Sequence, residues 1–117
     1  METRKQLDIF YLSDRDILSL NILPHRSAQT GITDYGFQIC YDWDNHEEIV
    51  GFEILDFSYF IPHLYEPGVV PEVKMRFDVQ DSDLTNVTLH EVLEWAYRRY
   101  ILCKEEPAVT VSLPGVE

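Results

Sequence analysis

The chain has 117 residues, of which 45% are hydrophobic and 13% aromatic. These values are typical of one globular domain and exclude a disordered chain, which lacks the apolar residues that a core needs. The 21 acidic and 9 basic residues give a net charge of −12, which repels nucleic-acid phosphates and argues against a nucleic-acid-binding role. We expect residues 1–117 to form a single domain. The acidity either favours a basic partner or only keeps a small protein in solution.

The cysteine content and the N-terminus bear on where the protein acts. Two cysteines, Cys40 and Cys103, are too few for the disulfide framework of a small secreted domain. The N-terminal apolar run ends at Ser13 and Asp14, too early for the core of a signal peptide. No stretch approaches the ~20 apolar residues of a membrane-spanning helix. We therefore expect a cytoplasmic protein that does not bind membranes.

The first half of the chain, residues 7–60, predicts a β-meander. Two apolar stretches, 7–12 and 17–23, are separated by a polar turn, which is typical of two antiparallel strands. Within the second stretch apolar and polar residues alternate, so one sheet face should be buried and the other partly wet. Residues 25–35 are mostly small and polar, which predicts a loop or a short irregular edge strand.

Residues 36–60 carry the clearest strand signal, a hairpin around which the rest is organised. Apolar and polar side chains alternate from Phe37 to Asp42 and again from Val50 to Ile54. The segment between them begins with Trp43, Asp44, Asn45 and His46. Asp and Asn tolerate the left-handed backbone that tight turns need.

This hairpin carries a resemblance to a known family. The stretch Val50–Ser58 (VGFEILDFS) closely matches a strand pattern V-G-hydrophobic-E-I-L-x-x-S, and Asp42 and Asp44 end the preceding strand. Residues 9–60 thereby resemble the domain-of-unknown-function 2283 family, although residues 45–47 replace a glycine that is usual in its turn. The resemblance implies a small antiparallel sheet and no established activity. Some members look like neighbours or partners of small toxin-like proteins.

The second half, residues 61–117, predicts a connector, a strand, a helix and a tail. Prolines and a glycine break regular structure over 61–71, with one helical turn expected near 58–64. Alternation over 73–79 predicts an amphipathic strand that extends the sheet. Residues 108–113 (AVTVSL) are expected to form a last short strand or an ordered tail.

One helix is predicted from Leu89 to about Cys103. Thr88 and Glu91 have the spacing of a capping box, and apolar residues follow at intervals of three and four. The elements together predict an α+β fold, with an antiparallel sheet of four or five strands and one C-terminal α-helix packed on a face.

The acidic hairpin outlines a calcium loop but does not complete it. Asp42, Asp44 and Glu53 stand at its first, third and twelfth positions. His46 and Glu47 occupy the fifth and sixth, where such a loop needs an oxygen ligand and a glycine. We therefore predict no metal ion and no cofactor.

No catalytic signature stands out, and we predict no catalytic residue. Phosphate-binding glycine loops and nucleophile elbows are absent from the sequence. The histidines are scattered without metal-ligand spacing: His25, His46, His63 and His90. A small hydrolase or metal-dependent enzyme that uses Asp, Glu and His residues remains the alternative, with Cys40 or Cys103 as a conceivable but unfavoured nucleophile.

The end of the helix predicts an interface. At about 100° per residue, Trp95 and Leu102 share a face that is not the core face. Arg98 and Arg99 lie beside them, and aromatic residues with arginine are typical of interface centres. We expect Trp95, Arg98, Arg99 and Leu102 to contact a second copy in a homodimer, unless residues 107–113 fold back over Trp95.

The best functional interpretation is a non-enzymatic protein–protein interaction module. It would self-associate or bind a basic partner such as a toxin-like protein. A nucleic-acid-mimicking inhibitor, with acids spaced like phosphates along one surface, is a further alternative.

Overall fold

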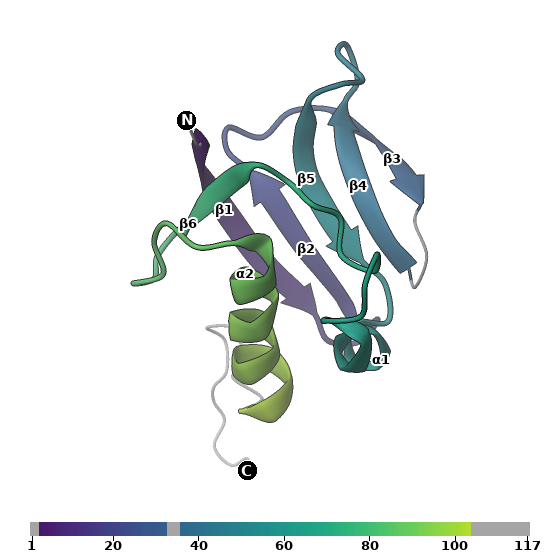
Figure 1. Cartoon of the computed structure of the whole chain (residues 1–117), viewed down its shortest axis with the longest axis vertical. Helices are drawn as coiled ribbons and strands as arrows, with labels where there is room; N and C mark the ends of the chain where they lie inside the picture. Colours follow the sequence, from purple (N-terminus) through teal and green to yellow (C-terminus); the bar gives the residue numbers. More distant parts are fainter. Residues whose placement is uncertain (1–2, 33–35, 104–117) are drawn as a thin grey trace.

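The computed structural model describes residues 3–32 and 36–103. They form an α+β fold in which short helices lie against one face of a six-stranded sheet (Figure 1). The short strand or tail predicted for residues 108–113 lies outside the described residues. The elements, in chain order, are β1 Thr3–Leu12, β2 Ile17–Ile22, β3 Ala28–Ile32, β4 Phe37–Asp42, β5 Ile49–Ile54, α1 Phe57–Phe60, η2 Ile61–His63, β6 Met75–Val79, α2 Leu89–Ala96 and η3 Tyr97–Leu102.

The sheet is larger than expected and mixed. Its strand order is β3-β4-β5-β2-β1-β6, and β6 runs parallel to β1 while the other neighbours are antiparallel. The prediction of four or five antiparallel strands with one helix was therefore wrong in detail. β3 forms a full edge strand, and the helical turn expected near 58–64 is present as α1 and η2, a second helical segment.

The parallel strand follows from the chain's path after β5. Since β5 and β1 point the same way, the chain must return across the sheet before β6 can pair with β1, and such a crossover needs a long connection. Residues 55–74 make it over the covered face (Figure 1), where Val69 and Val70 are buried.

Strand β1 joins the two halves of the chain. Its residues Thr3–Leu7 pair with β6, and its residues Leu7–Leu12 pair with β2. Leu7 is the residue that belongs to both ladders, opposite Ile22 and Val79, and it is fully buried. The position of everything after the connector therefore depends on this one strand.

The core lies between the covered sheet face and the helices. Phe37 packs against Phe52 and Phe60 with ring centroids 5.9 and 5.6 Å apart, and Phe52 also contacts Phe77 at 6.2 Å. From α2 the buried side chains are Leu89, Val92, Leu93 and Ala96. Burying such aromatic and aliphatic side chains stabilises the domain by roughly 1.5–3 kcal/mol each.

Asp16 fixes the turn between β1 and β2 to the start of α1. Its backbone is left-handed (φ 56°), which Asp tolerates better than most residues. Its carboxylate accepts hydrogen bonds from the Tyr11 hydroxyl (2.5 Å), the Ser58 hydroxyl (2.5 Å) and the Ser58 amide (3.1 Å). Its carbonyl accepts a bond from the Phe57 amide at 2.9 Å. Burial, and then the bond to Asp16, raises the pKa of Tyr11.

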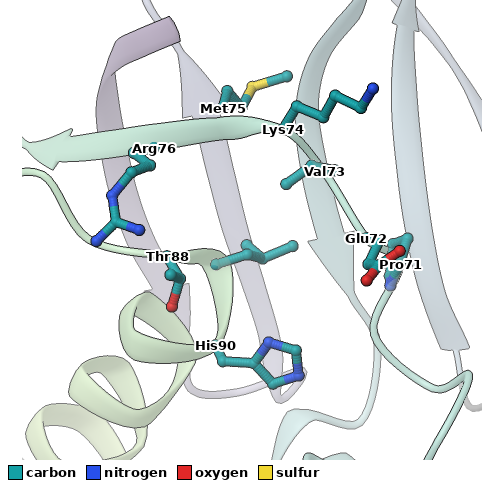
Figure 2. A pocket seen from close by; sticks show the side chains of 9 residues that line it. Pro71, Glu72, Val73, Lys74, Met75, Arg76, Thr88 and His90 are labelled. Carbon is teal, nitrogen blue, oxygen red and sulfur yellow. The ribbon is translucent and has the colours of Figure 1, made fainter. Parts of the chain in front are cut away.

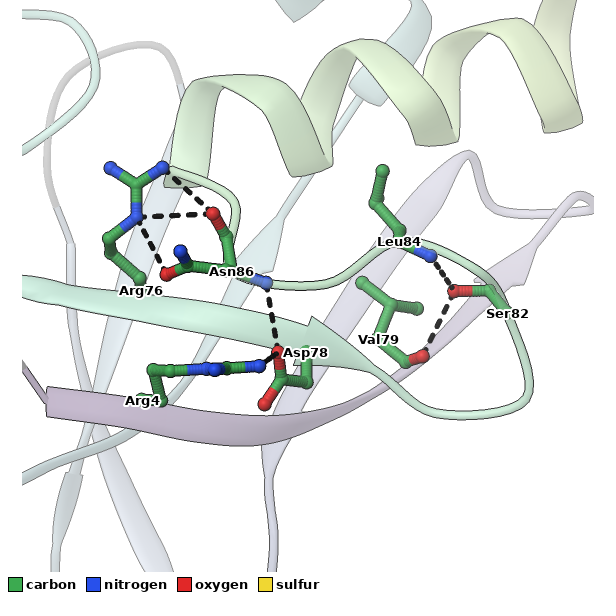
Figure 3. A network of polar contacts seen from close by, with 7 residues as sticks. All are labelled: Arg4, Arg76, Asp78, Val79, Ser82, Leu84 and Asn86. Carbon is green, nitrogen blue, oxygen red and sulfur yellow. Dashed lines mark hydrogen bonds and ion pairs between the residues drawn. The ribbon is translucent and has the colours of Figure 1, made fainter.

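A polar network holds β1, β6 and the loop before α2 together (Figure 3). Arg4 Nη2 lies 2.7 Å from Asp78 Oδ1, which also accepts from the Asn86 amide at 2.8 Å. Arg76 Nη2 donates to the Asn86 carbonyl at 2.8 Å. Backbone bonds between Phe77 and Val87 continue the contact along the outer edge of β6. The loop thus covers this sheet edge and leads directly into α2.

We predict that Asp16→Ala destabilises the fold by about 2–3 kcal/mol, because it removes a carboxylate that accepts bonds from three donor groups. The urea midpoint measured by circular dichroism checks this. Asp14→Ala, in the same exposed turn, is the matched control and should leave the midpoint nearly unchanged. Equal midpoints for the two variants would show that Asp16 is not a structural anchor.

Candidate protein-interaction surface

Helix α2 begins at the predicted capping box. The Thr88 hydroxyl accepts from the Glu91 amide at 3.2 Å, and the Glu91 carboxylate accepts from the Thr88 amide at 2.8 Å. The bond from the Thr88 amide is the largest cause of a lowered pKa of Glu91, and Arg76 lowers it further. The predicted helix start is confirmed.

The second half of the predicted helix is wound differently. η3, Tyr97–Leu102, is a π-helix, and the Cys103 amide bonds to the Arg98 carbonyl five residues back at 2.9 Å. Each residue of a π-turn rotates less about the axis than in an α-helix. A helical wheel drawn at 100° per residue therefore assigns residues beyond Ala96, including Leu102, to the wrong angular position around the helix.

Trp95 and Arg99 lie together. Trp95 is half-buried and meets the Tyr100 ring edge-on at 6.4 Å, while the Arg99 guanidinium carbon lies 5.0 Å from the Trp95 centroid and 5.8 Å from that of Tyr100. These three residues border a small cavity of about 130 Å³ together with Asp8 and Asp81. Trp95 is thus partly covered by its own chain.

Arg98 and Leu102 lie along a different cavity. Leu102 is 61% exposed and Tyr65 is 65% exposed. They border a groove of about 510 Å³, which we call the Leu102 groove, lined by Ile61, Pro62, Leu64, Tyr65, Glu94, Tyr97, Arg98 and Leu102. The lining is mainly apolar, with one acid and one base at its rim. Such a surface is typical of a contact with another protein.

Tyr65 is held in place at the rim of the groove. Its hydroxyl donates a short hydrogen bond to the Glu94 carboxylate, and its ring stacks on His90 with centroids 5.5 Å apart. The bond to Glu94 is the main cause of a raised pKa of Tyr65. A positioned aromatic side chain loses little conformational entropy when a partner binds.

The structure therefore divides the predicted interface residues into two pairs. Trp95 with Arg99 and Leu102 with Arg98 line separate cavities, although Arg98 also reaches a shallow depression beside Trp95. The analysis of the sequence missed Tyr65 and its neighbours in the connector. In the sequence, the sign of this surface was the largely apolar, proline-containing run 61–64 next to the aromatic residue Tyr65.

Asp42, the first acid of the incomplete calcium loop, stabilises the hairpin turn itself. Asp42 accepts from the amides of Asp44 (2.7 Å) and Asn45 (3.1 Å). The Arg26 guanidinium lies 3.2 Å from Asp42 and 2.7 Å from Glu48, so a side-chain cation already pairs with two carboxylates of this turn. Within the described residues no group of three or more potential metal ligands gathers.

Two other features bear on the enzyme alternative. Burial, and then the negative charge of Glu53, raises the pKa of the Cys40 thiol to about 11, so it stays protonated at neutral pH.

A cavity of about 480 Å³ lies between the start of β6 and α2, and Figure 2 shows Lys74 there pointing away from Thr88 and His90. Thr88 is engaged in the helix cap and Arg76 with Asn86. Neither feature assembles a nucleophile with a base.

Comparison with known proteins gives no relative: no family model, no curated protein and no solved structure matches the chain. In the described part of the chain, no helix combines the length and apolarity that crossing a membrane requires.

We predict that Thr88→Ala lowers the free energy of unfolding by about 1 kcal/mol at neutral pH. The pKa of Glu91 is lower in the folded state, so its stabilisation is present above the ordinary carboxyl range and is lost as the pH falls through the folded value. Thr88→Ala keeps the amide that donates to Glu91, so the variant that removes this pH dependence is Glu91→Gln, which cannot ionise. Urea midpoints at pH 7 and pH 3 should therefore differ less in Glu91→Gln than in the wild type, and an equal loss with acid in these two proteins would show that the Glu91 carboxylate does not contribute to the pH dependence.

Proposed function

We propose that this protein is a non-enzymatic protein–protein interaction module of the cytoplasm, and that the Leu102 groove is its contact surface. The observation that carries the proposal is the pair of large exposed side chains, Leu102 and Tyr65, on either side of one mainly apolar groove. Isolated apolar side chains on a surface are ordinary, but two that flank a concave apolar surface favour a partner.

A second copy of the chain is the partner that the groove suits best. Glu94 and Arg98 are one helical turn apart on its rim and carry opposite charges. In a two-fold association each contact occurs twice, so Arg98 of each copy could meet Glu94 of the other. Leu102 of each copy would then enter the other's groove. This arrangement keeps the predicted homodimer and relies on Leu102 and Arg98 more than on Trp95.

A basic protein is the second candidate partner. The net charge of −12 attracts such a partner and speeds its association. The proposed likeness of residues 9–60 to the domain-of-unknown-function 2283 family, with its toxin-like neighbours, adds to this candidate.

The experiment is light scattering on Leu102→Glu. We expect the wild type to give twice the 13.8 kDa chain mass at high micromolar concentration. The variant should be a folded monomer, since association would bury an unpaired carboxylate. Leu102 is exposed, so the substitution spares the core, whereas glutamate at half-buried Trp95 would also disturb packing.

Trp43→Glu is the matched control. Trp43 is 58% exposed but lies at the hairpin tip, outside the groove. This variant should keep the dimeric mass. A wild-type monomer at high concentration would contradict self-association, and loss of the dimer in Trp43→Glu but not in Leu102→Glu would place the interface elsewhere.

A further inference from the structure

The cavity beside Trp95 has the composition of a site for a cationic side chain. The rings of Trp95 and Tyr100 stand at 89° to one another and form two walls. Asp8 and Asp81 add carboxylates to the lining. Aromatic faces at right angles with nearby negative charge attract organic cations, because the ring faces carry negative potential.

The chain already places a cation against the aromatic walls of this cavity, which Arg99 itself helps to line. The Arg99 guanidinium lies over both rings, at 5.0 and 5.8 Å from their centroids. Arg99 comes from the same helix turn as the two aromatic residues, so its contact is local. The position shows which chemical group fits: a flat guanidinium that stacks on one ring and lies near the other.

We propose that the cavity formed by Trp95, Tyr100, Asp8 and Asp81 binds an arginine side chain of a basic partner protein, and that Arg99 is a built-in competitor for this place. The partner's guanidinium displaces that of Arg99, which moves into solvent. Asp8 and Asp81 then face the partner's positive charge. His25 Nε2, 3.5 Å from Asp8 Oδ2, is the neighbouring group that shares Asp8.

The inference rests on the proposed function only for the class of partner, the basic protein that is its second candidate. The cavity at Trp95 and the Leu102 groove share no lining residue, so each can fail without the other. When a competitor occupies a site, the apparent affinity equals the intrinsic affinity multiplied by the fraction of molecules in which the site is free. Removing Arg99 should therefore strengthen binding. Any arginine-to-alanine change also makes this acidic protein more negative and so attracts a basic peptide more strongly, and the test needs a control for that effect.

The test uses the full chain with Trp43→Phe, which leaves Trp95 as its only tryptophan. The probe is a peptide of alternating glycine and arginine, and the reference peptide has citrulline, a neutral isostere, in place of arginine. Binding is followed by Trp95 fluorescence at 150 mM salt. Arg99→Ala should bind the arginine peptide roughly 3- to 30-fold more tightly than the parent, the factor expected when a cation–π competitor is removed.

Arg15→Ala is the matched control, because it removes the same charge from an exposed residue that lines neither this cavity nor the Leu102 groove. It should change the affinity by less than about twofold. Arg99→Gln, which keeps part of the aliphatic stem, should bind more tightly than the parent as well and guards against an effect of alanine on folding. Equal strengthening by Arg15→Ala and Arg99→Ala, equal binding of the citrulline peptide, or no binding by either folded Arg99 variant would overturn the inference.

Discussion

The pairing of β1 with both β2 and β6 is the constraint on which the rest of the structure depends. Leu7 sits in both ladders and is fully buried, so the N-terminal sheet and the C-terminal half meet at this residue. The network of Arg4, Asp78 and Asn86 then ties β6 to the loop that leads into α2. Because α2 starts where this loop ends, the parallel strand determines where the helix lies on the sheet.

The surfaces proposed for binding follow from that position and from the change of helix type. α2 buries its apolar face as an ordinary amphipathic helix, with Val92, Leu93 and Ala96 fully covered. Trp95 lies on one flank of α2 itself, and after Ala96 the π-turn sets where Arg99 and Leu102 lie. Trp95 and Arg99 lie toward the β1–β6 side of the sheet, whereas Leu102 faces the connector at Pro62 and Tyr65. π-Turns are rare and frequently occur at functional sites.

Local signals explain what the sequence could predict. The hairpin of β4 and β5 was found because alternation and turn residues are encoded within it, although the bulge near Cys40 and Tyr41 was not. The capping box at Thr88 was found for the same reason. The parallel pairing of β6 was missed, because nothing in a strand's own pattern states its partner. The bonds between Asp16 and Ser58 join residues 42 positions apart and were equally hidden.

The candidate surface was predicted only in part, for a geometric reason. Composition singled out the aromatic and arginine-rich end of the helix as a candidate, but a helical wheel at a fixed angle per residue cannot anticipate a π-turn. Tyr65 and Pro62 reach the groove through tertiary contact, which no spacing within η3 reveals.

Amide hydrogen exchange at two protein concentrations tests the central claim, that η3 and the Leu102 groove form a contact surface, most directly. The account predicts that amides of residues 97–103 and of the segment around Tyr65 become more protected as the concentration rises from low to high micromolar, and that those of β3 do not. Protection that is independent of concentration would contradict it. So would new protection confined to β3, the edge strand that among the described strands pairs with β4 alone.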